Sequence, residues 1–196
     1  MFEALRSPPF HFNIAEDVIG WIGFGYGIEL LCCVFGLGLR IHGFELVQER
    51  VDATQRLFDQ LCSYASICSF IPFFEGYTPF ACSDSFSNLA PLDNPWETMV
   101  NLQQQNLTSL TSVDPTFLYF FDNYCEASPS ALLILLSHSP LVRGLISWHP
   151  PEDYAEAGQA TGVPTRVALV NQLIVHTTTG EANLAYLYEV VRSATT

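Results

Sequence analysis

The chain has 196 residues, of which 49% are apolar and 14% are charged, and its mean hydropathy is +0.24. All seven basic residues are arginines, and 20 carboxylates bring the formal charge to −13. A surface this negative repels phosphate backbones and anionic lipid headgroups, which argues against nucleic-acid binding and against docking on a membrane through basic residues. The composition leaves a single domain, or a membrane anchor that carries a domain.

The first long apolar segment runs from Val18 to Leu39. It contains one charged residue, Glu29, and an arginine closes it. As a helix it would extend about 33 Å, close to the thickness of a bilayer core. Upstream, Asn13 and Glu16 resemble a capping box. We therefore predict one transmembrane helix over residues 14–40, with a glycine-rich core helix of a non-membrane protein as the alternative.

The motif GFGYG, residues 23–27, lies inside this segment. Its G-x-G-x-G spacing departs from G-x-G-x-x-G, no Lys-Ser or Lys-Thr pair follows it, and no strand is predicted before it, so we expect no phosphate-binding loop. On a helix, four glycines would share one side and would let a second helix approach closely in lipid. These predicted helix-packing residues are Gly20, Gly23, Gly27 and Gly38.

Glu29 would lie at the centre of the predicted span. An ionised carboxylate is costly there, so we expect this group to be protonated, paired with an arginine of a neighbouring chain, or facing water. A hydrogen bond between helices is favoured over a proton relay, because the predicted span has no second acid and no histidine near its centre.

Residues 44–70 are predicted to form a charged amphipathic helix. Apolar residues recur there at alternating steps of four and three, which is typical of heptad positions. Thr54 weakens this seam, so a short coiled coil and an ordinary core helix both remain open. The predicted seam consists of Val47, Val51, Phe58, Leu61 and Ala65.

The rest of the chain is predicted to be an irregular linker, 71–93, and an acidic helical docking domain, 94–196. Good capping residues followed by proline recur in the second part and indicate helix starts. Residues 131–148 are apolar but are divided by a proline, so a buried helical hairpin is favoured over a second span. The segment 164–177 also suits a strand. The predicted helices are 95–108, 115–125, 129–138, 140–148, 164–177 and 181–193.

No catalytic pattern is recognisable in the sequence. Five histidines are scattered without metal-ligand spacing, so we assign no catalytic residue and expect no metal, cofactor or small-molecule substrate. The six cysteines contain no C-x-x-C pair, so free thiols are favoured. A disulfide between Cys82 and Cys125, or between Cys62 and Cys68, remains open.

A glycine-faced span followed by a heptad helix, over residues 14–68, resembles the small accessory subunits of mitochondrial ATP synthase, especially the subunit e type. That resemblance implies that Gly23 and Gly27 pack against the span of a sister subunit. It also implies an orientation opposite to the one that the positive-inside rule predicts from the arginines after the span.

We therefore predict a non-catalytic accessory subunit of a mitochondrial respiratory complex or ATP synthase, single-pass in the inner membrane. Its expected partners are other subunits of a membrane complex and membrane lipids. The alternative is a single-pass surface or secretory-pathway membrane protein with a lumenal recognition domain. An enzyme of unrecognised type is the third hypothesis.

Overall fold

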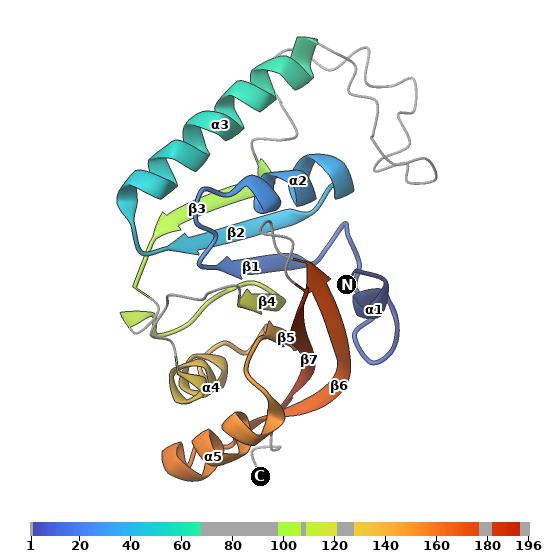
Figure 1. Ribbon diagram of the computed structural model, residues 1–196, viewed down its shortest axis with the longest axis vertical. Coiled ribbons are helices and arrows are strands. Elements are labelled where there is room, and N and C mark those ends of the chain that lie inside the picture. The colour runs from blue at the N-terminus through green and yellow to red at the C-terminus, as the bar shows by residue number, and fades with distance from the viewer. Residues whose placement is uncertain (1, 68–97, 107–108, 121–127, 177–181, 193–196) are drawn as a thin grey trace.

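The chain forms a mixed β-sheet that carries helices on both faces (Figure 1). The computed structural model describes residues 2–67, 98–106, 109–120, 128–176 and 182–192. Within these ranges the sheet has seven strands in the order β3-β2-β1-β4-β5-β7-β6. The strands are β1 (Val18–Ile22), β2 (Arg40–Glu45), β3 (Val100–Gln104), β4 (Phe117–Phe120), β5 (Gly144–Ser147), β6 (Thr165–His176) and β7 (Ala182–Arg192). The helices are α1 (Phe2–Arg6), α2 (Ile28–Leu37), α3 (Gln48–Ile67), α4 (Pro129–Ser137) and α5 (Pro151–Thr161).

Six of the strands run in one direction, and only β7 runs in the opposite direction. β3, β2, β1, β4 and β5 pair in parallel along the sheet. β7 pairs antiparallel with β5 and with β6. Every residue of β4 and of β5 is buried. A parallel strand that is covered on both faces has no polar side, so its sequence is a short apolar run without alternation.

Two hydrophobic clusters form the core, one on each face of the sheet. Phe117 and Tyr119 of β4 belong to the cluster that contains residues of α1, α2 and α3. Leu118 and Phe120 belong to the cluster that contains residues of α4 and α5. Successive side chains of a strand point to opposite faces, so β4 contributes to both layers of helices.

The predicted transmembrane helix over 14–40 is wrong, and so is the all-α fold class. The segment divides into β1, a glycine turn, α2 and the start of β2. No helix in the described parts of the chain has the length and apolar character needed to cross a membrane. A buried strand and a buried helix that follow each other have the summed length and composition of a span. The predicted single-pass location in the mitochondrial inner membrane is therefore wrong as well.

The predicted helical domain after residue 94 is also wrong. The structure does have a helix at α4, where Ser128 caps the first turn by accepting a hydrogen bond from the Ala131 N–H at 3.3 Å. The other five predicted helices fall on β3, β4, β5, β6 and β7. Pro115 and Pro140 precede strands, because a missing N–H is tolerated before a strand as well as in the first turn of a helix.

Several smaller predictions fall partly or wholly outside the described residues. These are the linker 71–93 and the thiols of Cys68, Cys82 and Cys125. The side chain of Cys62 is buried on α3.

Most of the predicted heptad seam lies on α3, which packs against α2 and the sheet. The rings of Phe58 and Phe35 of α2 have centroids 5.8 Å apart. Thr54 is fully buried, and its hydroxyl donates to the Arg50 carbonyl at 2.9 Å, so a polar residue is accommodated within the core. Val51 is buried, Leu61 is half-buried, Val47 is exposed ahead of the helix, and the side chain of Ala65 is outside the described set.

Arg192, the last residue of β7, holds the end of α4 and the turn that follows it. Its Nη2 atom donates to the carbonyls of Ser139 and Val142, each at 2.7 Å, and to that of Leu136 at 3.4 Å. Burial lowers the pKa of this guanidinium. The Leu136 and Ser139 carbonyls also accept hydrogen bonds from the N–H groups of Ser139 and Val142, so the guanidinium adds a charged donor to the end of the helix and to the turn after it.

We expect the substitution Arg192→Met to lower the free energy of unfolding by about 2 kcal/mol, because it removes the charged donor that these three carbonyls share. Urea denaturation of the full chain measures this loss. Arg166→Met is the matched control, since Arg166 lies exposed on β6, and its effect should stay within about 0.5 kcal/mol. Equal effects of the two substitutions would contradict the role given to Arg192.

Candidate functional site

The site is indicated by the order of the strands. From β1 the chain moves outward to β2 and β3, and it then returns to β4 on the other side of β1 before it reaches β5. In open α/β sheets, ligands bind in the crevice outside the carboxyl ends of the strands at such a switch point. Ile22 ends β1 and lies in register with Phe120, the end of β4, and with Phe44 of β2. The candidate site therefore lies beyond these three residues.

A glycine turn connects β1 to α2 at this edge. Gly23, Gly25 and Gly27 have φ angles of 73°, 59° and 68°, a region that other residues rarely adopt. The Gly23 N–H donates to the Phe44 carbonyl at 2.8 Å, and the Gly27 N–H donates to the Phe24 carbonyl at 2.9 Å. The turn is thereby tied to β2 and leads directly into the N-terminus of α2.

Gly25 and Gly27 are needed for different reasons. A Cβ atom at Gly27 would collide with the side chain of Thr54, so this glycine lets α2 pack closely on α3. A Cβ atom at Gly25 would have no heavy atom within 4 Å. Gly25 therefore borders open space, where the backbone is accessible to a ligand.

Glu45, the last residue of β2, closes the site from the other side. Only 5% of this residue is exposed. Its Oε2 atom accepts a hydrogen bond from the Gly25 N–H at 2.9 Å, and its Oε1 atom accepts one from the Val47 N–H at 3.1 Å. The Nη1 atom of Arg50 lies 3.5 Å from Oε1. A buried carboxylate needs such donors, and here they hold it against the glycine turn.

The rim of the site is aromatic and apolar. Tyr26, in the middle of the glycine turn, is 64% exposed, and the Arg50 guanidinium lies 5.9 Å from the centre of its ring. Ile28 and Leu46 are also exposed, to 58% and 50%. A flat aromatic ring beside a guanidinium provides a surface on which another planar group can stack.

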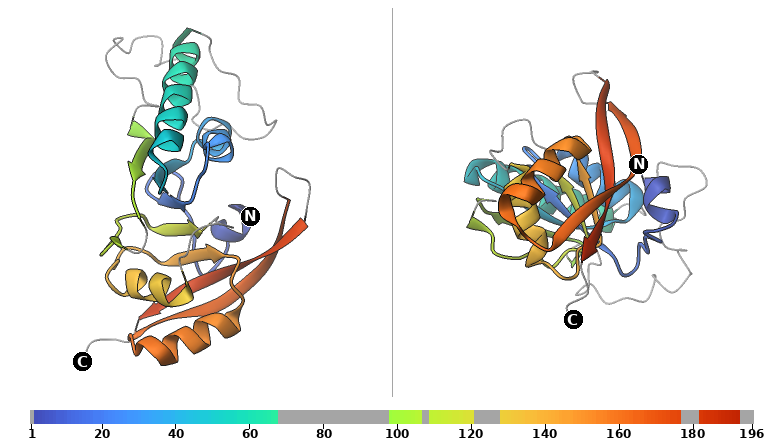
Figure 2. Two further views of the ribbon diagram at one scale, coloured as in Figure 1. Left: turned by 60° about the vertical axis from the view of Figure 1, so that its left-hand side comes forward. Right: turned by 90° about the horizontal axis from the view of Figure 1, so that it is seen from below.

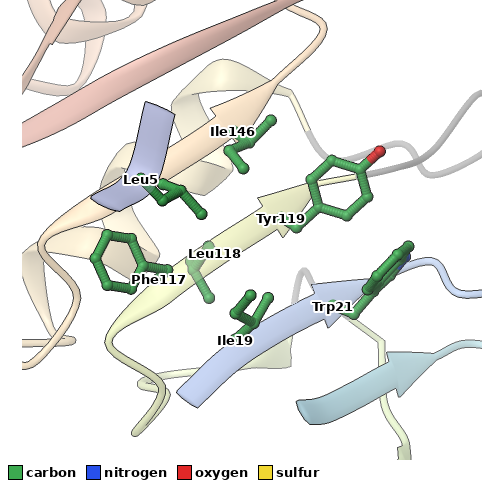
Figure 3. Close-up of a pocket in the computed structure, with 7 residues that line it drawn as sticks. All are labelled: Leu5, Ile19, Trp21, Phe117, Leu118, Tyr119 and Ile146. Carbon is green, nitrogen blue, oxygen red and sulfur yellow. The ribbon is translucent and has the colours of Figure 1, made fainter. Parts of the chain in front are cut away.

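An apolar cavity lies on the side of the sheet covered by α1 (Figure 3), and every residue that lines it is buried. Trp21 and Tyr119 stand near the ends of β1 and β4, with ring centroids 4.6 Å apart in an edge-to-face arrangement. Burial raises the pKa of Tyr119, with smaller contributions from Cys33 and Glu29, so its phenol stays neutral. The pocket is lined by Leu5, Ile19, Trp21, Phe117, Leu118, Tyr119 and Ile146.

One titratable pair follows the end of β5. The Nδ1 atom of His149 lies 3.3 Å from an oxygen of Asp153 in the first turn of α5. The imidazole stacks on the ring of Phe120, with centroids 6.0 Å apart, which places it beside the end of β4. Because the carboxylate engages Nδ1, the Nε2 atom is the position that can exchange a proton.

The structure separates most of the residues that the sequence predicted to act together. Gly20 lies within β1, and Gly38 ends α2 with a φ of 68°, so the four glycines share no helix face. Gly23 and Gly27 meet in the glycine turn. Glu29 lies in the first turn of α2, where the helix dipole favours a carboxylate.

Sequence reasoning missed the site for one reason: the strand before GFGYG was not recognised. One of the three grounds for expecting no phosphate-binding loop at this motif was the absence of a preceding strand, and β1 ends directly before it. Glu45 follows Gly25 by 20 residues, a spacing typical of the acidic residue in nucleotide-binding βαβ units. That spacing was the available signal.

Comparisons with known proteins place the fold but not the family. No family model matches the chain, and no curated protein matches its sequence. Magnesium protoporphyrin IX methyltransferase (ChlM) from Synechocystis PCC 6803 with bound SAM has a similar structure, with a TM-score of 0.52 and 15% identity over 90% of this chain and 70% of that chain. The chain shares the fold of methyltransferases.

Two further solved structures support the same fold. Geranyl diphosphate C-methyltransferase from Streptomyces coelicolor A3(2), in a complex that includes S-adenosyl-L-homocysteine, has a TM-score of 0.55 and 11% identity over 90% of this chain and 70% of that chain. P. horikoshii TYW2 in complex with MeSAdo has a TM-score of 0.53 and 11% identity over 90% of this chain and 58% of that chain.

These findings correct the functional predictions made from the sequence. The resemblance to subunit e of ATP synthase is wrong, because the fold is an α/β fold shared with methyltransferases. The predictions of a non-catalytic accessory subunit, and of partners limited to membrane-complex subunits and lipids without any substrate, are wrong for the same reason. They rested on a membrane-spanning helix that the described residues do not form.

The different surroundings of Gly25 and Gly27 in the glycine turn can be tested by mutation. Gly25→Ala should cost about 1 kcal/mol of unfolding free energy through its positive φ alone. Gly27→Ala should cost more, because the new methyl group also meets Thr54. Adding Thr54→Ala to Gly27→Ala should recover part of that excess, whereas adding it to Gly25→Ala should not. Urea denaturation of the single and double variants measures the coupling, and purely additive losses would contradict the contact.

Proposed function

We propose that the site at the carboxyl edge binds S-adenosylmethionine and that the chain is a methyltransferase. The observation that carries this proposal is the hydrogen bond from the Gly25 N–H to the buried carboxylate of Glu45 at the switch point of the sheet. Solved structures with the same fold contain SAM or S-adenosylhomocysteine. When bound, this cofactor supplies a methyl group on a positively charged sulfur.

The residues of the site fit such a cofactor. Glu45 ends the second strand, where an acidic side chain binds the hydroxyl groups of a ribose. The open space beside Gly25 lets the backbone contact the ligand closely. Gln105 follows β3, and its backbone N–H donates a hydrogen bond to the Glu45 carbonyl at 2.9 Å. A side-chain amide at this position can form hydrogen bonds with the edge of an adenine.

Charge favours this cofactor over nucleotides with phosphate groups. The chain has a formal charge of −13 and no lysine, so its field attracts a sulfonium and repels a pyrophosphate. The glycine turn also lacks the third-glycine spacing of the dinucleotide fingerprint. Finally, the antiparallel β7 inserted between β5 and β6 departs from the strand order of dinucleotide-binding sheets.

The chain's own residues define what an acceptor would meet. Trp21 and Tyr119 are buried, and they pack edge to face beside the ends of β1 and β4, so the protein interior next to this edge is apolar and favours a neutral acceptor over a charged one. A hydroxyl or amine acceptor must lose a proton when it is methylated. His149, oriented by Asp153, is placed at this edge to accept that proton at Nε2.

Binding of S-adenosylhomocysteine to the full chain, measured by isothermal titration calorimetry, tests the proposal without knowledge of the acceptor. We expect the wild-type chain to bind, and Glu45→Gln to weaken binding at least tenfold, because a hydrogen bond to a charged group contributes about 1.5–3 kcal/mol. Glu49→Gln, an exposed position one turn further on, is the matched control and should bind like the wild type.

Thermal unfolding of each variant without ligand separates loss of binding from loss of fold. NAD and ATP should give no heat of binding in the same experiment. Binding of either nucleotide in preference to S-adenosylhomocysteine, or no binding of any of the three by a folded chain, would contradict the proposed function.

A further inference from the structure

The hairpin of β6 and β7 projects beyond the rest of the sheet (Figure 2). β5 pairs only with the stretch Tyr186–Glu189 of β7, whereas β6 and β7 pair over nearly their whole lengths. β6 is the last strand of the sheet, with 12 residues. Its outer edge therefore presents a long row of backbone groups for which the described part of the chain provides no further strand.

The outer edge of β6 has few of the features that prevent the edge strands of two molecules from pairing. It has no lysine and no proline within it, and one β-bulge interrupts it between Leu169 and Asn171. At the bulge the Gln172 N–H is capped by the Asn171 side chain at 2.8 Å. Charged edge residues, prolines and bulges are the usual protections, and here they are confined to Arg166 and the bulge.

Large exposed apolar side chains gather on one face of this hairpin. Leu169, Ile174 and Leu184 are 41%, 71% and 43% exposed. Ile174 pairs directly with Leu184, and Leu169 pairs with Tyr188. Leu184 and Tyr188 are four residues apart on one strand and share a face, so all three side chains lie on that face. The bulge is what returns Leu169 to the same side as Ile174.

The local charge indicates which partner this edge accommodates. Residues 157–180 contain no carboxylate in a chain whose formal charge is −13. A basic protein is attracted more strongly by the rest of the surface, and a protein that brings acidic groups close to the rest of the surface is repelled. A second copy that pairs edge to edge extends the sheet, keeps its acidic helices away from those of the first copy, and offers an equally neutral strand.

We infer that β6 pairs antiparallel with β6 of a second copy of this chain, in a two-fold dimer. Around a dyad near the bulge, Ile174 of each copy lies toward Leu169 of the other, so apolar side chains meet on both sides of the axis. The paired strands extend about 40 Å. A single ribbon of this length buries less surface than a standard interface of about 1,600 Å², so the dimer belongs to the weak, reversible class.

Analytical ultracentrifugation of the full chain over roughly a hundredfold range of micromolar concentration tests this inference. We expect the mass to rise from monomer to dimer across that range. Ile174→Lys places a charge on the paired edge and should keep the chain monomeric throughout. Ile134→Lys is the matched control, because Ile134 is 45% exposed on α4, away from the edge, and this variant should still dimerise.

Hydrogen exchange distinguishes strand pairing from a loose apolar contact. The backbone amides of residues 168–174 that face away from β7 should exchange more slowly at dimer-forming concentration than at low concentration, except that of Gln172, which is already capped. A monomer at every concentration, a dimer that survives Ile174→Lys, or equal dissociation of the Ile134→Lys variant would overturn the inference. None of these outcomes depends on binding of S-adenosylhomocysteine, which both lysine variants should retain.

Discussion

The hydrogen bond between the Gly25 N–H and the Glu45 carboxylate depends on almost every level of this structure. It requires β1 and β2 to be parallel neighbours with aligned carboxyl ends, which the pairing of Ile22 with Phe44 ensures. In this structure the N–H reaches the end of β2 through a turn whose glycines have positive φ, a region that other residues rarely adopt. Two segments that are remote in sequence thereby form one rigid edge.

Burial of Glu45 explains the polar contacts around it. A carboxylate that is 5% exposed is costly unless hydrogen-bond donors replace water. Two backbone N–H groups and the Arg50 guanidinium take that place, and Arg50 in turn lies over the exposed ring of Tyr26. The carboxylate is thus held in one orientation before any ligand arrives, which reduces the ordering that binding would require.

The strand order explains both the carboxyl ends of the parallel strands, where the ligand site is proposed, and the exposed side of the last strand, β6. Helices cover both faces of the parallel strands, so the central strands are protected. The antiparallel hairpin of β6 and β7 continues past β5 and has apolar residues on an unprotected edge. The proposed ligand site and the inferred dimer edge are therefore separate features, one at the carboxyl ends of the parallel strands and the other along the last strand.

Several local features could be predicted from the sequence, because they depend on neighbouring residues. Ser128 before Pro129 indicates a helix start, and α4 begins there. The apolar spacing around Val51 and Phe58 suits one face of a helix, and both residues are buried on α3. The β-branched character of 164–177 already suited a strand, and β6 lies there.

The site depended on information that local patterns do not contain. β1 is almost entirely buried, and α2 carries apolar residues such as Ile28 and Cys32 on its exposed side too, so the apolar segment from Val18 to Leu39 shows neither the period of a strand nor that of a helix. Only the tertiary structure decided where that segment turns, because the turn is determined by contacts with β2 and α3, including the Phe44 carbonyl and Thr54. The sequence alone shows the glycines of the turn, the acidic residue that follows Gly25 by 20 positions, and the negative charge of the chain. Their assembly into one site required parallel pairing between distant strands, an interaction that leaves no periodic signal in either strand.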